Sequence, residues 1–160
     1  MAKVKPIPDG YHSLTPGLIV KGGKKAIEFY KAAFGAKELG VMYHLDGRSI
    51  MHAELQIGDS RFFLGDESKE MGALAPPTIG GTPVTLNIYT EDCDAMIKRA
   101  VAAGATVKMP AADMFWGDRY GKVIDPFGHH WGIATHKEDL TPEQMDKRRI
   151  EFEKKMGQKT

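Results

Sequence analysis

Hydrophobic residues recur at helical spacing in two segments of the chain, 26–36 and 95–105. In each segment a glycine, Gly35 or Gly104, follows the last apolar turn, where a helix commonly ends on a residue in the left-handed conformation. The two glycines are 69 residues apart (104 − 35), and this spacing indicates an internal duplication. The two helices are predicted over 24–34 and 92–103.

Alternation of apolar and polar residues predicts four strands around each helix. It is clearest in the strand predicted over 49–57, where His52, Glu54 and Gln56 alternate with apolar residues, namely Met51, Ala53, Leu55 and Ile57. One face of each sheet then packs on its own helix, and we expect the other, polar face to line a cavity. Each half of the chain therefore has the order strand, helix, strand, strand, strand. The predicted strands are 13–20, 37–45, 49–57 and 60–65 in the first half, and 83–90, 105–110, 119–125 and 129–135 in the second.

The same pattern divides the chain into two modules, a linker and a tail. After residue 136 the alternation stops, and Thr141 followed by Pro142 marks the start of a helix that runs to about Met156. We expect this helix to lie on the surface of the domain or against a second subunit. The predicted boundaries are 1–66 for the first module, 67–81 for a glycine- and proline-rich linker, 82–136 for the second module and 137–160 for the helical tail.

Composition narrows the class of protein. A length of 160 residues suits one domain, and 22 basic against 21 acidic residues give a net charge of +1, too small a field to attract nucleic acid or an anionic membrane. No apolar run reaches the length of a membrane-spanning helix. The one cysteine, Cys93, excludes an internal disulfide and suits a reducing compartment. We therefore expect a cytoplasmic protein with no nucleic-acid or membrane partner.

Several strings of residues are similar to those of one known family; they lie at 7–12, 26–30, 52–55, 80–84, 115–121 and 125–131. With the tandem βαβββ order, they resemble the vicinal oxygen chelate (VOC) superfamily, in its PhnB-like glyoxalase/bleomycin resistance protein/dioxygenase branch. The resemblance implies an α+β fold, in which tandem βαβββ modules form a cupped mixed β-sheet, with a C-terminal helix added. It also implies a homodimer that binds a small molecule.

Enzymes of that superfamily hold one divalent metal in the sheet cavity, with two ligands from each module. Carried over position by position, the ligand positions fall near Thr15, at Thr82 or Pro83, at Gly132, and near Leu64 or Gly65. None of these is a histidine or a carboxylate, so we predict no metal ligands and no cofactor. The alternative is a rearranged divalent-metal site built around His52 and Glu54, which would need further ligands from other strands.

The segment 115–121 is dense in groups that contact ligands. Trp116 and Tyr120 supply stacking area, Arg119 supplies a fork of donors for a carboxylate or phosphate, and Asp118 would orient Arg119. In the alternative interpretation the segment is a structural hairpin, whose aromatic rings plug the end of the core while Asp118 and Arg119 pair with each other.

The polar face of the strand at 49–57 supplies the second group of candidates. His52 and Glu54 are the candidate catalytic residues, with Glu54 as a general base if the protein performs chemistry. The alternative is a satisfied hydrogen-bond network that joins strands of one sheet. The expected function is therefore small-molecule binding, and the alternative is a metal-dependent VOC enzyme, either a lyase or isomerase or a dioxygenase; a purely structural module is a third class. The predicted ligand-binding residues are Gln56, Asn87, Trp116, Asp118, Arg119, Tyr120 and His130.

Overall fold

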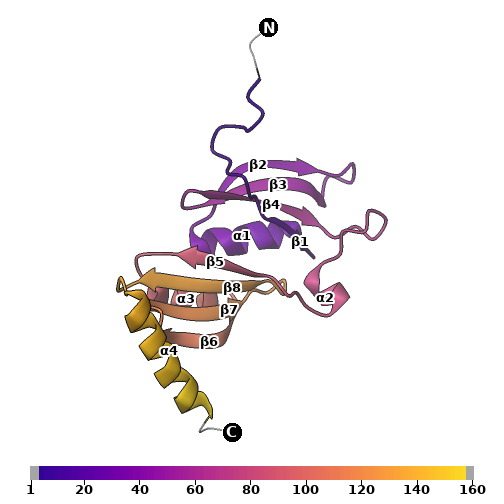
Figure 1. Ribbon diagram of the computed structural model, residues 1–160. Coiled ribbons are helices and arrows are strands. Elements are labelled where there is room, and N and C mark those ends of the chain that lie inside the picture. The colour runs from indigo at the N-terminus through magenta and orange to yellow at the C-terminus, as the bar shows by residue number, and fades with distance from the viewer. Residues whose placement is uncertain (1–3, 158–160) are drawn as a thin grey trace.

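The computed structural model describes residues 4–157 and contains two copies of a βαβββ module, followed by a helix (Figure 1). The first module consists of β1 (Gly17–Val20), α1 (Gly23–Phe34), β2 (Lys37–Tyr43), β3 (Ile50–Ile57) and β4 (Ser60–Asp66). The second consists of β5 (Thr85–Tyr89), α3 (Cys93–Ala102), β6 (Thr106–Asp113), β7 (Asp118–Ile124) and β8 (His130–His136). A short helix, α2 (Pro76–Ile79), lies between the modules, and α4 (Pro142–Gly157) follows them.

The eight strands form two four-stranded mixed sheets, with the strand orders β1-β4-β3-β2 (sheet 1) and β5-β8-β7-β6 (sheet 2). In each sheet the first strand pairs with the last in parallel, and the other neighbours are antiparallel. The α+β class is thereby confirmed. The strand predicted from residue 13 begins only at Gly17, because Pro16 has no N–H with which to continue the ladder and offers only its carbonyl, which accepts the Phe63 N–H at 2.8 Å.

The two helices begin and end by different local means. Helix α1 ends at Gly35, whose φ of +67° is the left-handed conformation that glycine adopts at lowest cost. At its start no residue of the helix supplies a side-chain cap, and Asp66 from β4 accepts the N–H groups of Gly22 and Gly23 instead, at 2.9 and 2.8 Å. Helix α3 is capped within its own segment by Asp92, which accepts the N–H of Ala95. The cap from β4 ties α1 to its sheet.

An aromatic cluster joins the two modules into one core. Trp131 of β8 lies 4.8 Å from Phe34 and 5.5 Å from Tyr30 of α1, measured between ring centroids. Phe29 of α1, Phe62 of β4 and Phe127 of the β7–β8 turn belong to the same cluster. A single group of buried side chains therefore spans both modules, and α1 packs against sheet 2 as well as sheet 1.

A buried carboxylate at the centre of this cluster collects four hydrogen bonds. Asp125, only 4% exposed, accepts the Tyr30 hydroxyl at 2.7 Å and the Trp131 indole N–H at 2.9 Å. Its other oxygen accepts the backbone N–H groups of Phe127 and His129, each at 2.9 Å. Burial and the nearby charge of Asp125 raise the pKa of Tyr30 well above its usual value. Since Tyr30 belongs to one module and Asp125 to the other, this hydrogen bond fixes their relative position.

Each sheet has a face that packs on helices and an opposite face, here called the open face. In β3, Ala53 and Leu55 are fully buried in the core, so His52, Glu54 and Gln56 lie on the open face of sheet 1. In sheet 2 the buried Val123, Trp131 and Ile133 define the helix side. The side chains of Tyr120 and Lys122, together with Gly132 and Ala134, therefore belong to its open face.

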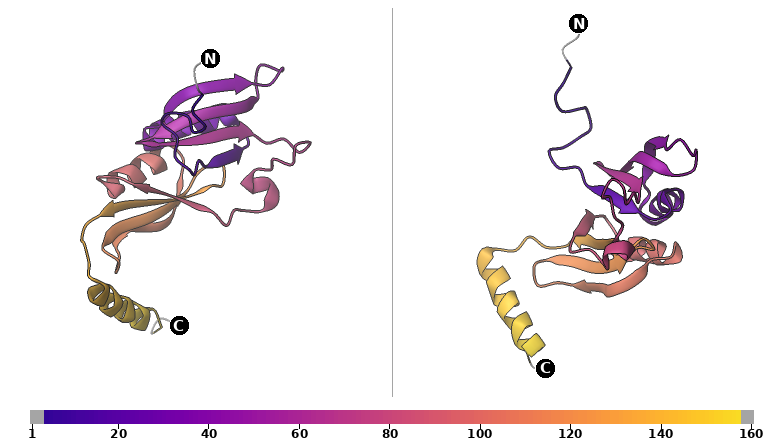
Figure 2. Two further views of the ribbon diagram at one scale, coloured as in Figure 1. Left: turned by 45° about the horizontal axis from the view of Figure 1, so that its top comes forward. Right: turned by 90° about the vertical axis from the view of Figure 1, so that its right-hand side faces the viewer.

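Helix α4 extends away from the two sheets (Figure 2), and none of the residues Pro142–Gly157 is buried. It is held by contacts near its base and along one side, where Phe152 packs on Phe115 at 5.4 Å and Arg148 pairs with Glu138 at 2.6 Å. Phe152 and Met156 remain 38% and 56% exposed. The apolar side chains Ile150, Phe152 and Met156 are therefore only partly covered by the rest of the chain.

The Asp125 cluster predicts the effect of one substitution in α1. Tyr30→Phe removes a single hydroxyl and keeps the ring packing, so we expect the free energy of unfolding to fall by about 1–2 kcal/mol. Urea unfolding followed by tryptophan fluorescence measures the change. Tyr43→Phe is the matched control because Tyr43 is 45% exposed on β2. Equal stability of the two variants would contradict the role given to Asp125.

Candidate functional site

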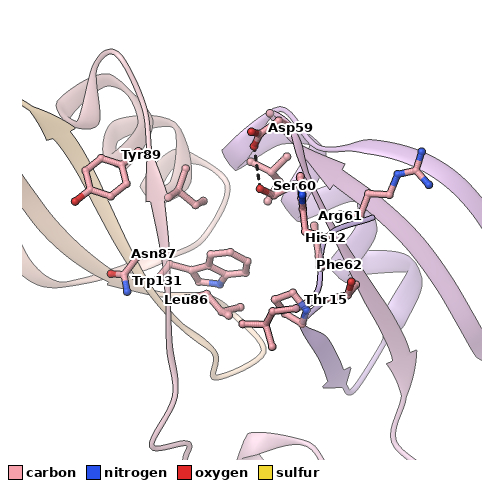
Figure 3. Close-up of a pocket in the computed structure, with 15 residues that line it drawn as sticks. His12, Thr15, Asp59, Ser60, Arg61, Phe62, Leu86, Asn87, Tyr89 and Trp131 are labelled. Carbon is pink, nitrogen blue, oxygen red and sulfur yellow. Dashed lines mark hydrogen bonds between the residues drawn. The ribbon is translucent and has the colours of Figure 1, made fainter. Parts of the chain in front are cut away.

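The residues predicted from the sequence divide into two groups on the two sheets. His52, Glu54 and Gln56 lie on the open face of sheet 1, whereas Asn87, Trp116, Asp118 and Tyr120 surround the open face of sheet 2. Figure 3 shows the space between the modules: Arg61 of sheet 1 points away from it on one side, and Asn87 and Tyr89 of sheet 2 point away on the other. The fold thus presents the two groups on different surfaces of one chain.

The second group lines a hollow of about 440 Å³ on the open face of sheet 2. Its walls include the rings of Trp116 and Tyr120, whose centroids are 5.7 Å apart, and the side chains of Met109 and Met114. Aromatic rings and thioethers form an apolar, adaptable surface. We call this the sheet 2 hollow; it is lined by Asn87, Tyr89, Met109, Met114, Trp116, Asp118, Tyr120, Lys122 and Ala134.

Gly132 lies beneath two polar side chains of this face. A Cβ at that position would overlap the Asn87 side-chain oxygen and would lie only 2.5 Å from the Tyr120 hydroxyl oxygen. The Tyr120 hydroxyl donates to Asn87 Oδ1 at 3.4 Å, so the two side chains contact each other above the glycine. A larger residue at 132 would therefore displace Asn87 or Tyr120, and these two side chains occupy its place.

Asp118 holds the wall of the hollow in place. It is 4% exposed and accepts hydrogen bonds from the Tyr89 hydroxyl at 2.9 Å, the Trp116 indole N–H at 3.1 Å and His136 Nδ1 at 2.8 Å. Burial opposes its ionisation, but these donors, His136 first among them, lower its pKa overall. The hydrogen bonds of the Asp118 carboxylate thus position Trp116 and Tyr89, and its burial shields it from a ligand.

Arg119 does not share this surface, and it does not pair with Asp118. Residues 119, 121 and 123 of β7 face α3, and the Arg119 guanidinium pairs with Asp94 of α3, with one N–O distance of 2.9 Å, and with Asp113 at 3.1 Å. These carboxylates raise the pKa of Arg119. The sequence interpretation treated 115–121 as one unit, but consecutive residues of a strand point to opposite faces. The charge of Arg119 is therefore neutralised outside the sheet 2 hollow.

The open face of sheet 2 carries a different cation, Lys122. It is two residues after Tyr120, so strand alternation places both on the same face, and both line the sheet 2 hollow. Among residues 4–157 no acidic group lies within 4 Å of its amine and no hydrogen bond engages it. Sequence analysis missed Lys122, although the same alternation could have identified it.

On sheet 1, a residue from the N-terminal segment completes the other group. The Tyr11 hydroxyl donates to Glu54 Oε2 at 2.5 Å, and His52 Nε2 lies 3.7 Å from Glu54 Oε1. The bond to Glu54, together with burial, raises the pKa of Tyr11. The Arg61 guanidinium lies over the Tyr11 ring, 4.6 Å from its centroid. Glu54 is thus held between His52 and Tyr11, with its side chain 36% exposed and accessible.

The two remaining predicted residues lie apart from these clusters. Gln56 donates from its side chain to the Gly58 carbonyl at 2.8 Å, which stabilises the β3–β4 turn. His130 borders a separate hollow beside β1 and β5, with Val84 and His129. His129 contacts the Ile19 carbonyl through Nε2 at 2.9 Å, so it joins the modules. Neither Gln56 nor His130 lines the sheet 2 hollow.

The side chains present do not fit a divalent ion of the kind that the family resemblance implies. At Gly132 there is no carboxylate, and the donors above the backbone are an amide oxygen and a phenol, which bind divalent ions weakly. On sheet 1, Gly65 lies on the open face without a side chain, and His52 and Glu54 supply only two donors. Within residues 4–157 no three histidine, cysteine, aspartate or glutamate side chains gather as a metal site requires.

Comparison with known proteins identifies a family and several relatives of this chain. Residues 12–133 match the family model described as Glyoxalase/Bleomycin resistance protein/Dioxygenase superfamily. The uncharacterized protein Rv0887c of Mycobacterium tuberculosis is 40% identical over 136 residues, which cover 83% of this chain and 79% of that protein. The uncharacterized protein At5g48480 of Arabidopsis thaliana is 35% identical over 128 residues, 76% of each chain.

Solved structures show the same fold. The X-ray structure of the Arabidopsis At5g48480 product is 32% identical, with a TM-score of 0.62, and the match covers 78% of this chain and 98% of that one. TioX from Micromonospora is 24% identical, with a TM-score of 0.61, over 81% of this chain and all of that one. No helix within residues 4–157 is long and apolar enough to cross a membrane.

The Asp118 network predicts a pH-dependent contribution to stability from His136. Hydrogen bonds to Asp118 and Asp139 raise the pKa of His136 above 6.5. Its stabilising effect is therefore complete below that value and is lost as the pH rises through the higher folded-state pKa. We expect His136→Ala to lower the free energy of unfolding more at about pH 6 than at about pH 9, as measured by urea unfolding.

His12→Ala is the control, because His12 is exposed in the segment before β1 and forms no ion pair with the described residues. If the cost of His136→Ala is the same at both pH values, the charged bridge between His136 and Asp118 does not contribute to folding.

Proposed function

The chain belongs to the glyoxalase/bleomycin resistance protein/dioxygenase superfamily, and we propose that it binds a small organic anion in the sheet 2 hollow. The observation that carries the proposal is Lys122, a half-buried cation with no acidic partner within the described chain, beside the rings of Trp116 and Tyr120. A ligand with a carboxylate, phosphate or sulfonate would pair with Lys122, and a flat or apolar part would lie on the rings.

The other charges of the hollow support an anionic ligand. Asp118 is the acidic residue of its lining, and its oxygens already accept three hydrogen bonds. Its negative charge is also balanced by His136 when that residue is protonated. Lys122 is thereby left as the group that attracts an incoming charge. Asn87 and Tyr120 add hydrogen-bonding groups that can orient the ligand.

We propose that binding proceeds without a metal. Support comes from the glycine at 132, where Asn87 and Tyr120 occupy the place of a carboxylate, and from the two-donor set of His52 and Glu54. A cytoplasmic location, inferred from the single cysteine, stays a prediction.

An enzymatic function is the second candidate, and the pair formed by His52 and Glu54 favours it. Glu54 is within reach of a ligand on sheet 1, and Tyr11 hydrogen-bonds to it. It could accept a proton there as a general base. In the metal-dependent version, a lyase, isomerase or dioxygenase would require further ligands from another chain to complete the coordination of an ion.

Substitution of Lys122 tests the binding proposal. We expect 2-naphthoate to bind more tightly than the neutral 2-naphthamide, by about fivefold, because only the acid pairs with Lys122. Lys122→Gln should remove this difference, as measured by isothermal titration calorimetry. Lys98→Gln, which makes the same charge change on the exposed side of α3, should preserve it.

Repeating the titration after dialysis against a chelator separates the two candidates. Unchanged affinity supports metal-free binding. Affinity that is lost and then restored by manganese or zinc would contradict it and favour the metal-dependent enzyme. Failure of both naphthalene compounds to bind would leave a structural module as the better description.

We further propose that the protein is a homodimer, in which the second copy covers the open faces. The support is the row of exposed apolar side chains on β2, with Leu39 at 43%, Met42 at 59% and Tyr43 at 45% exposure, and the uncovered apolar residues of α4. A second copy could also place the sheet 1 cluster of one chain over the sheet 2 hollow of the other, which one chain alone does not do.

Sedimentation equilibrium tests the dimer. We expect a mass of about 35 kDa, twice 17.6 kDa, and a shift toward the monomer when residues 137–160 are removed. A mass of one chain at all micromolar concentrations would contradict the proposal.

A further inference from the structure

A second cavity, of about 420 Å³, lies between the two modules (Figure 3). On one side it is bounded by the segment before β1 and the β3–β4 turn, and on the other by β5 and Trp131. Trp131 points into it, whereas the side chains of Asn87 and Tyr89 point away toward the sheet 2 hollow (Figure 3). We call this the inter-module cavity. Its size is within the range of small-molecule pockets.

Much of its wall is apolar and belongs to the core. Phe62 and Trp131 are 4% and 3% exposed, and their rings lie 6.3 Å apart within the aromatic cluster that joins the modules. The indole N–H of Trp131 already donates to Asp125, so the ring offers the cavity only apolar surface. Leu86 and Ile88 of β5 and Ile57 of β3 extend this surface toward the opening. The cavity would therefore accept an aromatic or aliphatic body.

The charge at the opening is negative. Asp59 lies in the β3–β4 turn at the edge of the cavity, and Ser60 donates its hydroxyl to Asp59 Oδ1 at 2.9 Å. Among residues 4–157 no basic group lies within 4 Å of the Asp59 carboxylate. Arg61 also belongs to the lining, but its guanidinium points away from the cavity (Figure 3). It lies over the Tyr11 ring on the open face of sheet 1. His12 and Tyr89 are the other titratable residues of the lining, and the Tyr89 side chain points away from the cavity.

From this combination we propose that the inter-module cavity is a second ligand site, which takes an organic cation: an amine attached to an aromatic or aliphatic body. The body enters between Trp131 and the β5 side chains, and the amine remains at the opening beside Asp59. Its charge preference is opposite to that of the sheet 2 hollow, where Lys122 attracts anions. The two sites are on opposite sides of β5, and each has its own tryptophan, so they can be followed separately.

Three probes with one body and different charges test the site: 4-phenylbutylamine, 4-phenylbutanol and 4-phenylbutyrate. In the full-length Trp116→Phe variant, Trp131 is the sole tryptophan and reports on this cavity. We expect saturable changes in its fluorescence, with the amine binding about threefold to fivefold more tightly than the alcohol, and the butyrate binding most weakly. No saturable change with any probe, or the tightest binding by the butyrate, would overturn the proposal.

Asp59→Asn identifies the source of the preference. The amine should then bind only as tightly as the alcohol, whereas Glu70→Gln, the same charge change in an exposed loop, should leave the preference intact. A preference that persists in Asp59→Asn would contradict the assigned role of the carboxylate.

A filling variant and a direct contact measurement locate the ligand. Ile88→Phe adds volume inside the cavity and should weaken binding of all three probes at least tenfold, roughly as expected for a blocked pocket. If that variant does not fold, nuclear Overhauser effects in the unsubstituted protein give the same answer. Contacts between the phenyl protons of the amine and the methyl groups of Leu86 and Ile88 support the site; contacts only with Met109 or Met114 would overturn it.

Discussion

The arrangement of this molecule depends on the hydrogen bond between Tyr30 of the first module and the buried Asp125 of the second. An unpaired carboxylate in an aromatic core would be costly, and four donors satisfy this one. Because one of those donors comes from α1, the helix sides of both sheets are drawn into a common core. The open faces of both sheets consequently point outward, and the polar side chains of each module are presented to solvent or to a second chain.

Asp118 plays a similar part beside the sheet 2 hollow. Like Asp125, it is 4% exposed and accepts hydrogen bonds from a tyrosine hydroxyl and a tryptophan indole, here Tyr89 and Trp116. One carboxylate thus sets the tryptophan that borders the inter-module cavity, and the other sets the tryptophan that borders the sheet 2 hollow. The oxygens of both carboxylates accept hydrogen bonds from the protein itself. The charges that we propose for ligand binding are Lys122 in the sheet 2 hollow and Asp59 at the inter-module cavity, and they have opposite signs.

The sequence was sufficient for the elements of the fold but not for their assembly. Helical spacing and the glycine at 35 located α1, and strand alternation placed His52, Glu54 and Gln56 on one face. The same alternation, applied to β7, separates Arg119 from Tyr120 and selects Lys122. The pairing of Arg119 with Asp94 depends on a contact between residues 25 positions apart in the chain, on different elements. The joining of the modules through Tyr30 and Asp125, 95 positions apart, has no local signature.

The most direct test of the account is methyl NMR of the methionine side chains during titration with 2-naphthoate. Met109 and Met114 line the sheet 2 hollow, whereas Met71 is 78% exposed in the loop before α2, and Met42 and Met51 belong to sheet 1. We expect saturable ring-current shifts at Met109 and Met114, with Met71 unchanged. Shifts confined to Met42 and Met51, or no shift at Met109 and Met114 at saturation, would contradict the assignment of the ligand to the sheet 2 hollow.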